Sequence, residues 1–118
     1  MSGQEKARIL CVSRSAYQLR AMRGALPSRE YELLSAISPD QAVAVCLSNH
    51  ISAVVLDSEF SNESGWSAVR TLKMVSPQLR VMLLSKNGNG TVPNGVDAVA
   101  HSHSHILSKL KELLESGE

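Results

Sequence analysis

Three histidines alternate with serines near the end of the chain, where residues 100–105 read Ala-His-Ser-His-Ser-His. Imidazole nitrogens bind zinc, copper and nickel, and alternate residues of an extended strand share one face. On a straight strand, however, His101 and His105 would be about 13 Å apart, so one ion could not be bound by all three unless the chain bends. A loop leading into a helix, with a serine or histidine capping it, is therefore favoured over a metal site at His101, His103 and His105.

An aspartate that could take part in chemistry ends the apolar run Ile51 to Asp57, which reads Ile-Ser-Ala-Val-Val-Leu-Asp. Such a run of β-branched and aliphatic residues predicts a buried strand. The carboxylate of Asp57 has two interpretations: it accepts hydrogen bonds at a strand-to-loop turn, or it serves as a chemical acceptor. Because Ser13, Arg14 and Ser85 also follow predicted strands, we expect them at the same edge of the sheet.

Short apolar runs alternate with helical patterns along the whole chain. The predicted strands are residues 8–13, 31–36, 51–57, 81–84 and 96–100. Helical patterns follow Ser15, Ser38 and Gly65, and the last helix is predicted over residues 106–114. This alternation is typical of a parallel sheet with right-handed crossovers and helices on both faces. Residues 86–95 contain three glycines and one proline, which argue against a helix there.

Composition limits the classes of function. A chain of 118 residues predicts one domain, with residues 1–7 and 115–118 as flexible ends. The net charge of +1, with both signs interspersed, gives no footprint for direct binding of nucleic acid or an anionic membrane. No apolar run reaches the roughly 18 residues of a membrane span, so we expect a cytoplasmic protein. Cys11 and Cys46 lie in apolar runs and are expected to be buried thiols.

Five fragments share their order and spacing with one protein family. They are Ile-Leu-Cys-Val in the first strand, Ala-Val-Val-Leu-Asp at 53–57, Gly65 eight residues later, Pro77 ahead of Arg-Val-Met-Leu-Leu-Ser at 80–85, and Gly-Val-Asp-Ala-Val-Ala at 95–100. The chain thereby resembles the receiver domain of bacterial two-component response regulators over nearly its whole length. The resemblance implies an α/β, flavodoxin-like, doubly wound parallel sheet of five strands in the order 2-1-3-4-5. It also implies that the family's fourth helix, expected near residues 86–94, is short or missing.

The resemblance assigns roles to two residues that keep the family's chemistry. Asp57 stands at the position of the aspartate that accepts a phosphoryl group from a kinase histidine. Ser85 stands where the family has the threonine or serine that senses the phosphoryl group, so it is switch-like.

Other positions depart from the family pattern. Ser13 and Arg14 replace the two acidic residues that help to hold a magnesium ion. The Lys-Pro pair of the family falls on Ser102 and His103, and its switch aromatic falls on Val99. Because magnesium prefers anionic oxygen ligands, we expect no cofactor and regard magnesium binding as doubtful.

These departures suggest a degenerate receiver domain. We expect a non-enzymatic module of two-component (phosphorelay) signal transduction that works by contact with a histidine kinase, an effector domain or a second copy, without normal magnesium-dependent phosphorylation. One alternative is a conventional receiver phosphorylated on Asp57. Another is a flavodoxin-like protein that binds a small ligand or a metal, although the chain has no Gly-x-Gly-x-x-Gly loop.

Two hypotheses concern the charge beside Asp57. The guanidinium of Arg14 could form a fixed ion pair with Asp57 in place of the metal cation. Alternatively, a protonated His101 or His103 could lean toward Asp57 and replace the missing lysine, which would make the site pH-sensitive.

Overall fold

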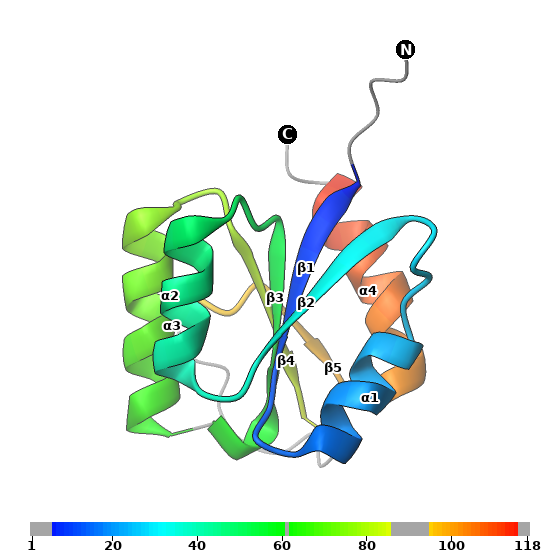
Figure 1. The fold of residues 1–118 in the computed structure, drawn as a ribbon, viewed down its shortest axis with the longest axis horizontal. Coiled ribbons are helices and arrows are strands. Elements are labelled where there is room, and N and C mark those ends of the chain that lie inside the picture. The colour runs from blue at the N-terminus through cyan, green and yellow to red at the C-terminus, as the bar shows by residue number, and fades with distance from the viewer. Residues whose placement is uncertain (1–5, 61, 86–94, 116–118) are drawn as a thin grey trace.

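The described part of the chain forms a five-stranded sheet with two helices on each face (Figure 1). The structure is a computed structural model that describes residues 6–60, 62–85 and 95–115. Its elements in chain order are β1 (Ala7–Val12), α1 (Ala16–Gly24), β2 (Tyr31–Ala36), α2 (Pro39–Ser48), β3 (Ala53–Asp57), a 3-10 turn (Ser58–Phe60), α3 (Glu63–Val75), β4 (Arg80–Leu84), β5 (Ala98–Ala100) and α4 (His103–Glu115). All strand pairs are parallel.

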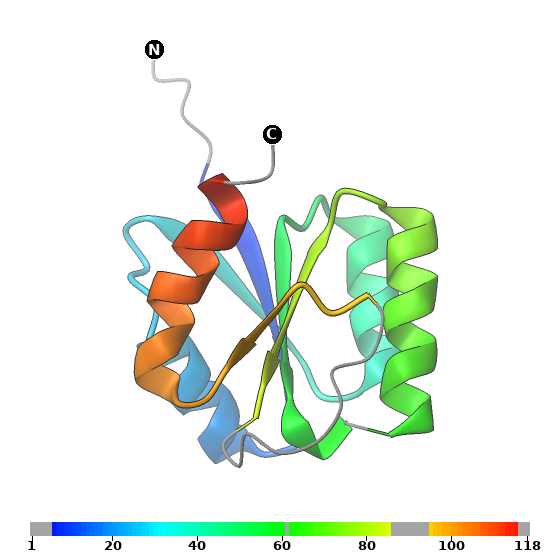
Figure 2. The ribbon, with the colours of Figure 1, turned by 180° about the vertical axis from the view of Figure 1, so that it is seen from behind.

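The sheet order is β2-β1-β3-β4-β5, which confirms the predicted fold class. Helices α1 and α4 cover one face of the sheet, and α2 and α3 cover the other, as the two opposite views show (Figure 2). The predicted loss of the fourth helix concerns residues 86–94, which lie outside the described residues. No helix in the described ranges is long and apolar enough to cross a membrane.

Two hydrophobic layers hold the helices to the sheet, one on each face. The layer beneath α1 and α4 includes Ile9, Cys11, Met22, Val55, Met82, Ile106 and Leu110. The layer beneath α2 and α3 includes Leu10, Val12, Ala42, Val54, Val69, Leu72 and Val81. Because both faces of the central strands are buried, their sequences are continuously apolar rather than alternating.

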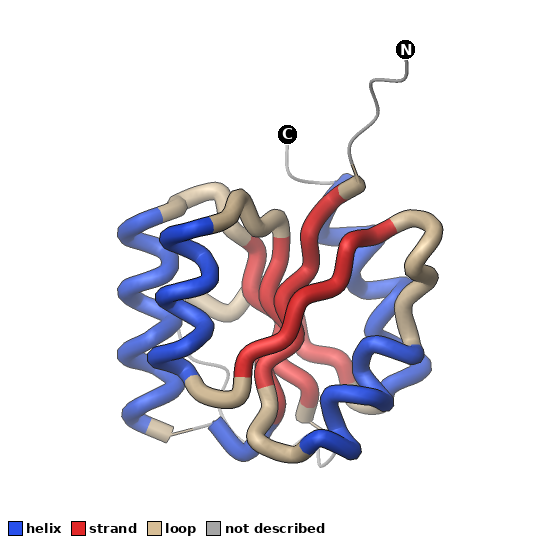
Figure 3. The backbone as a smooth tube through the Cα atoms, in the orientation of Figure 1, coloured by secondary structure: helices blue, strands red, loops and turns tan. Residues whose placement is uncertain are grey.

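Side-chain caps set the start of each of the first three helices. Ser15 Oγ accepts from the backbone N–H of Gln18 at 3.2 Å, and Ser38 Oγ accepts from Gln41 at 3.1 Å. Asn62 does the same for α3, since its Oδ1 accepts from the N–H of Gly65 at 3.0 Å. Each cap contributes about 1 kcal/mol and keeps the strand-to-helix loops short. The tube view shows these loops at one edge of the sheet, where β1 and β3 end (Figure 3).

Several element ends differ from the sequence-based expectation. β5 begins at Ala98 rather than at residue 96, because Asp97 is held by β4: its N–H donates to the carbonyl of Val81, and its carboxylate accepts from the N–H of Val81. Ala7 and Glu115, assigned above to flexible ends, belong to β1 and α4.

The predicted loop at the histidine run is shorter than expected. α4 begins at His103, three residues before the predicted start at Ile106, so His103 and His105 are helical residues. Only His101 and Ser102 form the connection from β5 to α4. The extended geometry that would put three imidazoles on one face is therefore absent from this segment.

Candidate functional site

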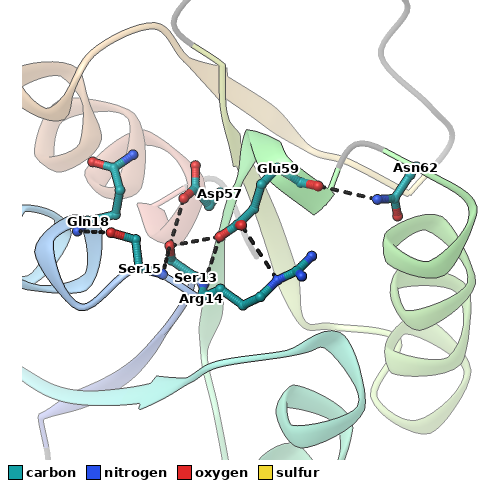
Figure 4. A network of polar contacts seen from close by, with 7 residues as sticks. All are labelled: Ser13, Arg14, Ser15, Gln18, Asp57, Glu59 and Asn62. Carbon is teal, nitrogen blue, oxygen red and sulfur yellow. Dashed lines mark hydrogen bonds and ion pairs between the residues drawn. The ribbon is translucent and has the colours of Figure 1, made fainter.

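Two polar residues are buried side by side where β1 and β3 end. In the described part of the chain the buried residues are apolar or aromatic with two exceptions, Ser13 and Asp57. Asp57 is the last residue of β3, and Ser13 directly follows β1, the strand that pairs with β3. The hydroxyl of Ser13 donates to Asp57 Oδ2 at 2.7 Å (Figure 4). A fully buried carboxylate group with a neutral donor is costly unless further polar contacts support it.

The hydroxyl of Ser13 is the centre of a small polar network. Its oxygen accepts from the backbone N–H of Ser15 at 3.1 Å and lies 3.0 Å from Glu59 Oε2. A hydroxyl has one proton, so Ser13 can donate to only one of the two carboxylates at a time. The carboxylate that does not accept the proton still lies close to the hydroxyl oxygen, so the acidic groups of Asp57 and Glu59 are both near the same atom.

Glu59 joins the loop after β1 to the turn after β3. Its Oε2 accepts from the backbone N–H of Arg14 at 2.7 Å, and its Oε1 lies 3.6 Å from Arg14 Nε. The carbonyl of Glu59 accepts from Asn62 Nδ2 at 3.2 Å, which connects the same turn to the start of α3. Sequence reasoning missed Glu59. The available signal was an acidic residue two positions after Asp57 in a chain that has no acid after its first strand.

The predicted ion pair between Arg14 and Asp57 is wrong. The guanidinium of Arg14 pairs with Glu59 instead and stands over the ring of Phe60, 5.5 Å from its centre. The 3-10 turn places Glu59 nearer to Arg14 than the end of β3 is, so the exposed acid receives the cation. Since two thirds of the Arg14 side chain is exposed, solvent screens this pair, and it contributes about 1 kcal/mol or less.

Solved structures of known proteins match the fold of this chain. The response regulator receiver domain protein (CheY-like) from Methanospirillum hungatei superposes with a TM-score of 0.81, at 19% identity over 96% of this chain and 97% of that chain. The chain has the fold of a response-regulator receiver domain. The signal receiver domain of an HD domain-containing protein from Pseudomonas fluorescens matches with a TM-score of 0.82, at 17% identity over 99% of this chain and 93% of that chain.

A third solved structure, that of a response regulator protein, contains a bound ligand. Response regulator protein TrrA from Thermotoga maritima, in complex with Mg(2+)-BeF, matches with a TM-score of 0.78, at 20% identity over 92% of this chain and 99% of that chain. No protein-family model matches the sequence, and no curated protein matches it either.

Within the receiver fold, Ser85 is tied to the end of β5. Its N–H donates to the carbonyl of Ala100 at 2.8 Å, and its own carbonyl lies 3.1 Å from His101 Nδ1. The hypothesis that His101 or His103 leans toward Asp57 is not confirmed, because His101 faces the Ser85 carbonyl and the hydroxyl of Ser13 is the partner of the Asp57 carboxylate.

The histidines do not form a common site. His103 and His105 are two residues apart on α4, which turns their side chains about 200° away from each other. In the ranges that the structure describes, no group of three histidine, cysteine or acidic residues is placed to hold a metal ion. Two further positions of the predicted motif lie in this region: Val99 packs partly buried against the layer beneath α2 and α3, and Ser102 Oγ lies 2.9 Å from Ser104 Oγ.

The donor set at Asp57 does not fit a magnesium ion. Magnesium requires hard, mostly anionic oxygen ligands in an octahedral arrangement. Here a buried hydroxyl, that of Ser13, faces Asp57 where the receiver pattern has a carboxylate. The second carboxylate of the network, Glu59, is already bound by the main chain and the guanidinium of Arg14. A cation would have to break both sets of contacts before it could use these oxygens.

Proposed function

We propose that this domain is a receiver-like signalling module of two-component (phosphorelay) signal transduction, and that it acts by protein contact without normal magnesium-dependent phosphorylation of Asp57. The likeness of its fold to response-regulator receiver domains supports the signalling role. The observation that carries the second part is the buried hydrogen bond from Ser13 to Asp57. In this proposal the domain is not an enzyme, and it works in the cytoplasm.

The chemistry of phosphoryl transfer explains why this hydrogen bond matters. Transfer needs an accessible acceptor oxygen and cations that neutralise the charge on the moving phosphoryl group. Asp57 is 5% exposed, its Oδ2 is occupied by the Ser13 hydroxyl, and the carboxylate of Glu59 lies within 3.0 Å of the same hydroxyl. An incoming dianion would therefore meet the second negative charge of Glu59 close to the acceptor. TrrA, by contrast, was solved with Mg(2+)-BeF.

Contact with another protein is then the means of signalling. The partner is a histidine kinase, an effector domain or a second copy of the chain. In this proposal the network of Ser13, Arg14 and Glu59 links the loops after β1 and β3, and this edge of the sheet keeps its arrangement without a phosphoryl group.

The direct test is phosphorylation by a small donor. The wild type, Asp57→Asn and the double variant Ser13→Asp with Arg14→Asp are incubated with acetyl phosphate and Mg²⁺, and the intact mass of each is measured. A receiver with the usual acidic pair serves as the positive control. We expect no phosphoryl increment on the wild type or on Asp57→Asn, and a gain on the double variant, because it restores two carboxylates beside the acceptor.

Two results would contradict the proposal. An increment on the wild type that Asp57→Asn removes would identify a conventional phosphoreceiver. A folded double variant that still takes no phosphoryl group would show that the missing acids are not the reason for inactivity. Circular dichroism of all three proteins confirms that folding is intact.

A further inference from the structure

A groove with a positive rim runs between α1 and the edge strand β2, away from Asp57. It has a volume of about 590 Å³ and is lined by Ala16, Leu19, Arg20 and Arg23 of α1 together with Leu33 and Ser35 of β2. With Gly24, which also lines the groove, the five residues of α1 lie at positions i, i+3, i+4, i+7 and i+8, so they share one face of the helix. We refer to this feature as the α1–β2 groove.

The charge of the groove is not compensated. Arg20 and Arg23 are exposed, and within the described ranges neither forms an ion pair; the one side-chain contact of Arg23 is with Ser35 Oγ, at 3.5 Å. None of the residues that line the groove is acidic. Glu32, the acidic residue of β2 itself, is already paired with Arg8 at 3.1 Å. Two guanidinium groups with free donors therefore face one hollow.

The strand beside these arginines is open on one side. β2 is the first strand in the order β2-β1-β3-β4-β5, and among the residues that the structure describes it pairs with β1 alone. An edge strand presents a row of unpaired backbone N–H and C=O groups that another extended chain can join. Leu33 on this strand and Leu19 on α1 are only partly buried, and both border the groove. The site thus offers backbone donors and acceptors, an apolar floor and two positive charges.

We propose that the α1–β2 groove binds an acidic, extended segment of a partner protein, which adds a strand to β2. In such an arrangement alternate side chains of the segment point to the α1 side of the sheet. Its carboxylates, at alternate positions, pair with Arg20 and Arg23 on that side, beside Leu19 and Leu33, and its apolar side chains point to the opposite face of the sheet. This contact is separate from Asp57 and holds whether or not Asp57 is phosphorylated.

Charge also decides between an acidic partner and a second copy. Two copies that paired through their β2 edges around a twofold axis would continue one sheet, with α1 of both copies on the same face. The arginines of the two grooves would then face one another, and like charges at close range oppose that pairing. A chain rich in aspartate or glutamate meets no such repulsion.

The test uses a fluorescein-labelled peptide of alternating valine and glutamate, followed by fluorescence anisotropy, with the lysine-for-glutamate peptide as control. We expect Arg20→Glu to weaken binding by about tenfold or more. Arg70→Glu makes the same charge change on α3, where Arg70 is exposed and 3.7 Å from an exposed glutamate, and we expect a change of less than about twofold. Amide chemical shifts of the wild type should move in α1 and β2.

A steric variant tests the groove without changing its charge. Gly24 lines the groove, and a Cβ built on it meets no atom within 4 Å, so the first atom of the larger side chain in Gly24→Phe finds open space. We expect Gly24→Phe to fold normally and to weaken peptide binding.

Four results would overturn the proposal. Equal loss in Arg20→Glu and Arg70→Glu would show unspecific attraction to net charge. Chemical-shift changes confined to residues outside α1 and β2 would show that the peptide binds elsewhere. No binding of the peptide to the folded wild type at millimolar concentration would show that the groove does not bind acidic segments. A wild-type dimer in sedimentation that Gly24→Phe dissociates would assign the groove to a second copy.

Discussion

The hydroxyl oxygen of Ser13 lies 2.7 Å from Oδ2 of Asp57, and both side chains are buried at the carboxyl edge of the sheet. The same hydroxyl lies 3.0 Å from Glu59 Oε2, so one proton serves two carboxylates. A receiver with acids at these positions would collect a cation around Asp57. In this chain the carboxylates of Asp57 and Glu59 instead form hydrogen bonds with the Ser13 hydroxyl and the Arg14 main chain.

Removal of the Ser13 hydroxyl should therefore destabilise the fold. In Ser13→Ala the buried carboxylate of Asp57 and the N–H of Ser15 both lose their partner, and we expect a loss of about 1–3 kcal/mol in the free energy of unfolding. Urea denaturation followed by circular dichroism measures it. Ser67→Ala, at an exposed position of α3, is the control and should change stability by no more than about 0.5 kcal/mol. Equal stability of the two variants would mean that the Ser13 hydrogen bond contributes nothing.

Gly65 and Gly24 should respond in opposite ways to the same substitution. A Cβ at Gly65 would overlap the carbonyl oxygen of Phe60, where the 3-10 turn approaches the start of α3, whereas a Cβ at Gly24 meets nothing within 4 Å. We expect Gly65→Ala to cost about 1–3 kcal/mol or more, since the clash is with backbone. Gly24→Ala should be neutral or stabilising by up to about 1 kcal/mol. Thermal unfolding of the pair provides the comparison, and a stable Gly65→Ala protein would refute the close packing.

Asp97 anchors the start of β5 to β4 by two contacts of its Oδ2. It accepts from the N–H of Val81 at 2.8 Å and from Lys73 Nζ at 2.7 Å. Asp97→Ala leaves the partly buried N–H unpaired and should cost about 1–3 kcal/mol. Lys73→Met removes only the ion pair and should cost about 1 kcal/mol or less. Urea unfolding separates the two effects; similar losses would show that the ion pair, rather than the backbone contact, holds the strand.

The thiol of Cys11 should make the fold sensitive to alkali. Burial raises the pKa of Cys11 from its ordinary value of 9.0 to about 12, although the charge of Arg23 opposes the rise. Between these values the unfolded chain loses the thiol proton and the folded chain keeps it. Because the unfolded state then binds fewer protons, stability should fall as the pH rises through this window.

The comparison of wild type with Cys11→Val isolates this effect from other groups that titrate in alkali. Burial also raises the pKa of Cys46, to about 11, and that contribution is present in both proteins. When the pH is raised from about 8 to about 10.5, the urea concentration at the midpoint of unfolding should fall further for the wild type than for the variant. If the two proteins lost the same amount, Cys11 would not be the group responsible.

Much of the fold could be predicted from local pattern. The strands and helices follow from the apolar runs and from the capping residues Ser15 and Ser38, because burial and helix capping act on neighbouring residues. The order of the strands came from the resemblance to receiver domains and was confirmed. The histidine run was harder to interpret, since its early helical start depends on packing of Ile106 and Leu110 beneath the sheet.

By itself, the sequence determined that this chain is an α/β sheet with Asp57 at a strand end and without the acids that should accompany it. Only the tertiary structure decided which groups surround that aspartate. Arg14 and Glu59 are 45 residues apart in the chain, and no local pattern indicates that a 3-10 turn brings them together. Side-chain partners across two loops depend on the exact path of the backbone, where shifts of an ångström exchange one carboxylate for another. For the same reason the α1–β2 groove becomes visible only when the helix is packed beside its edge strand.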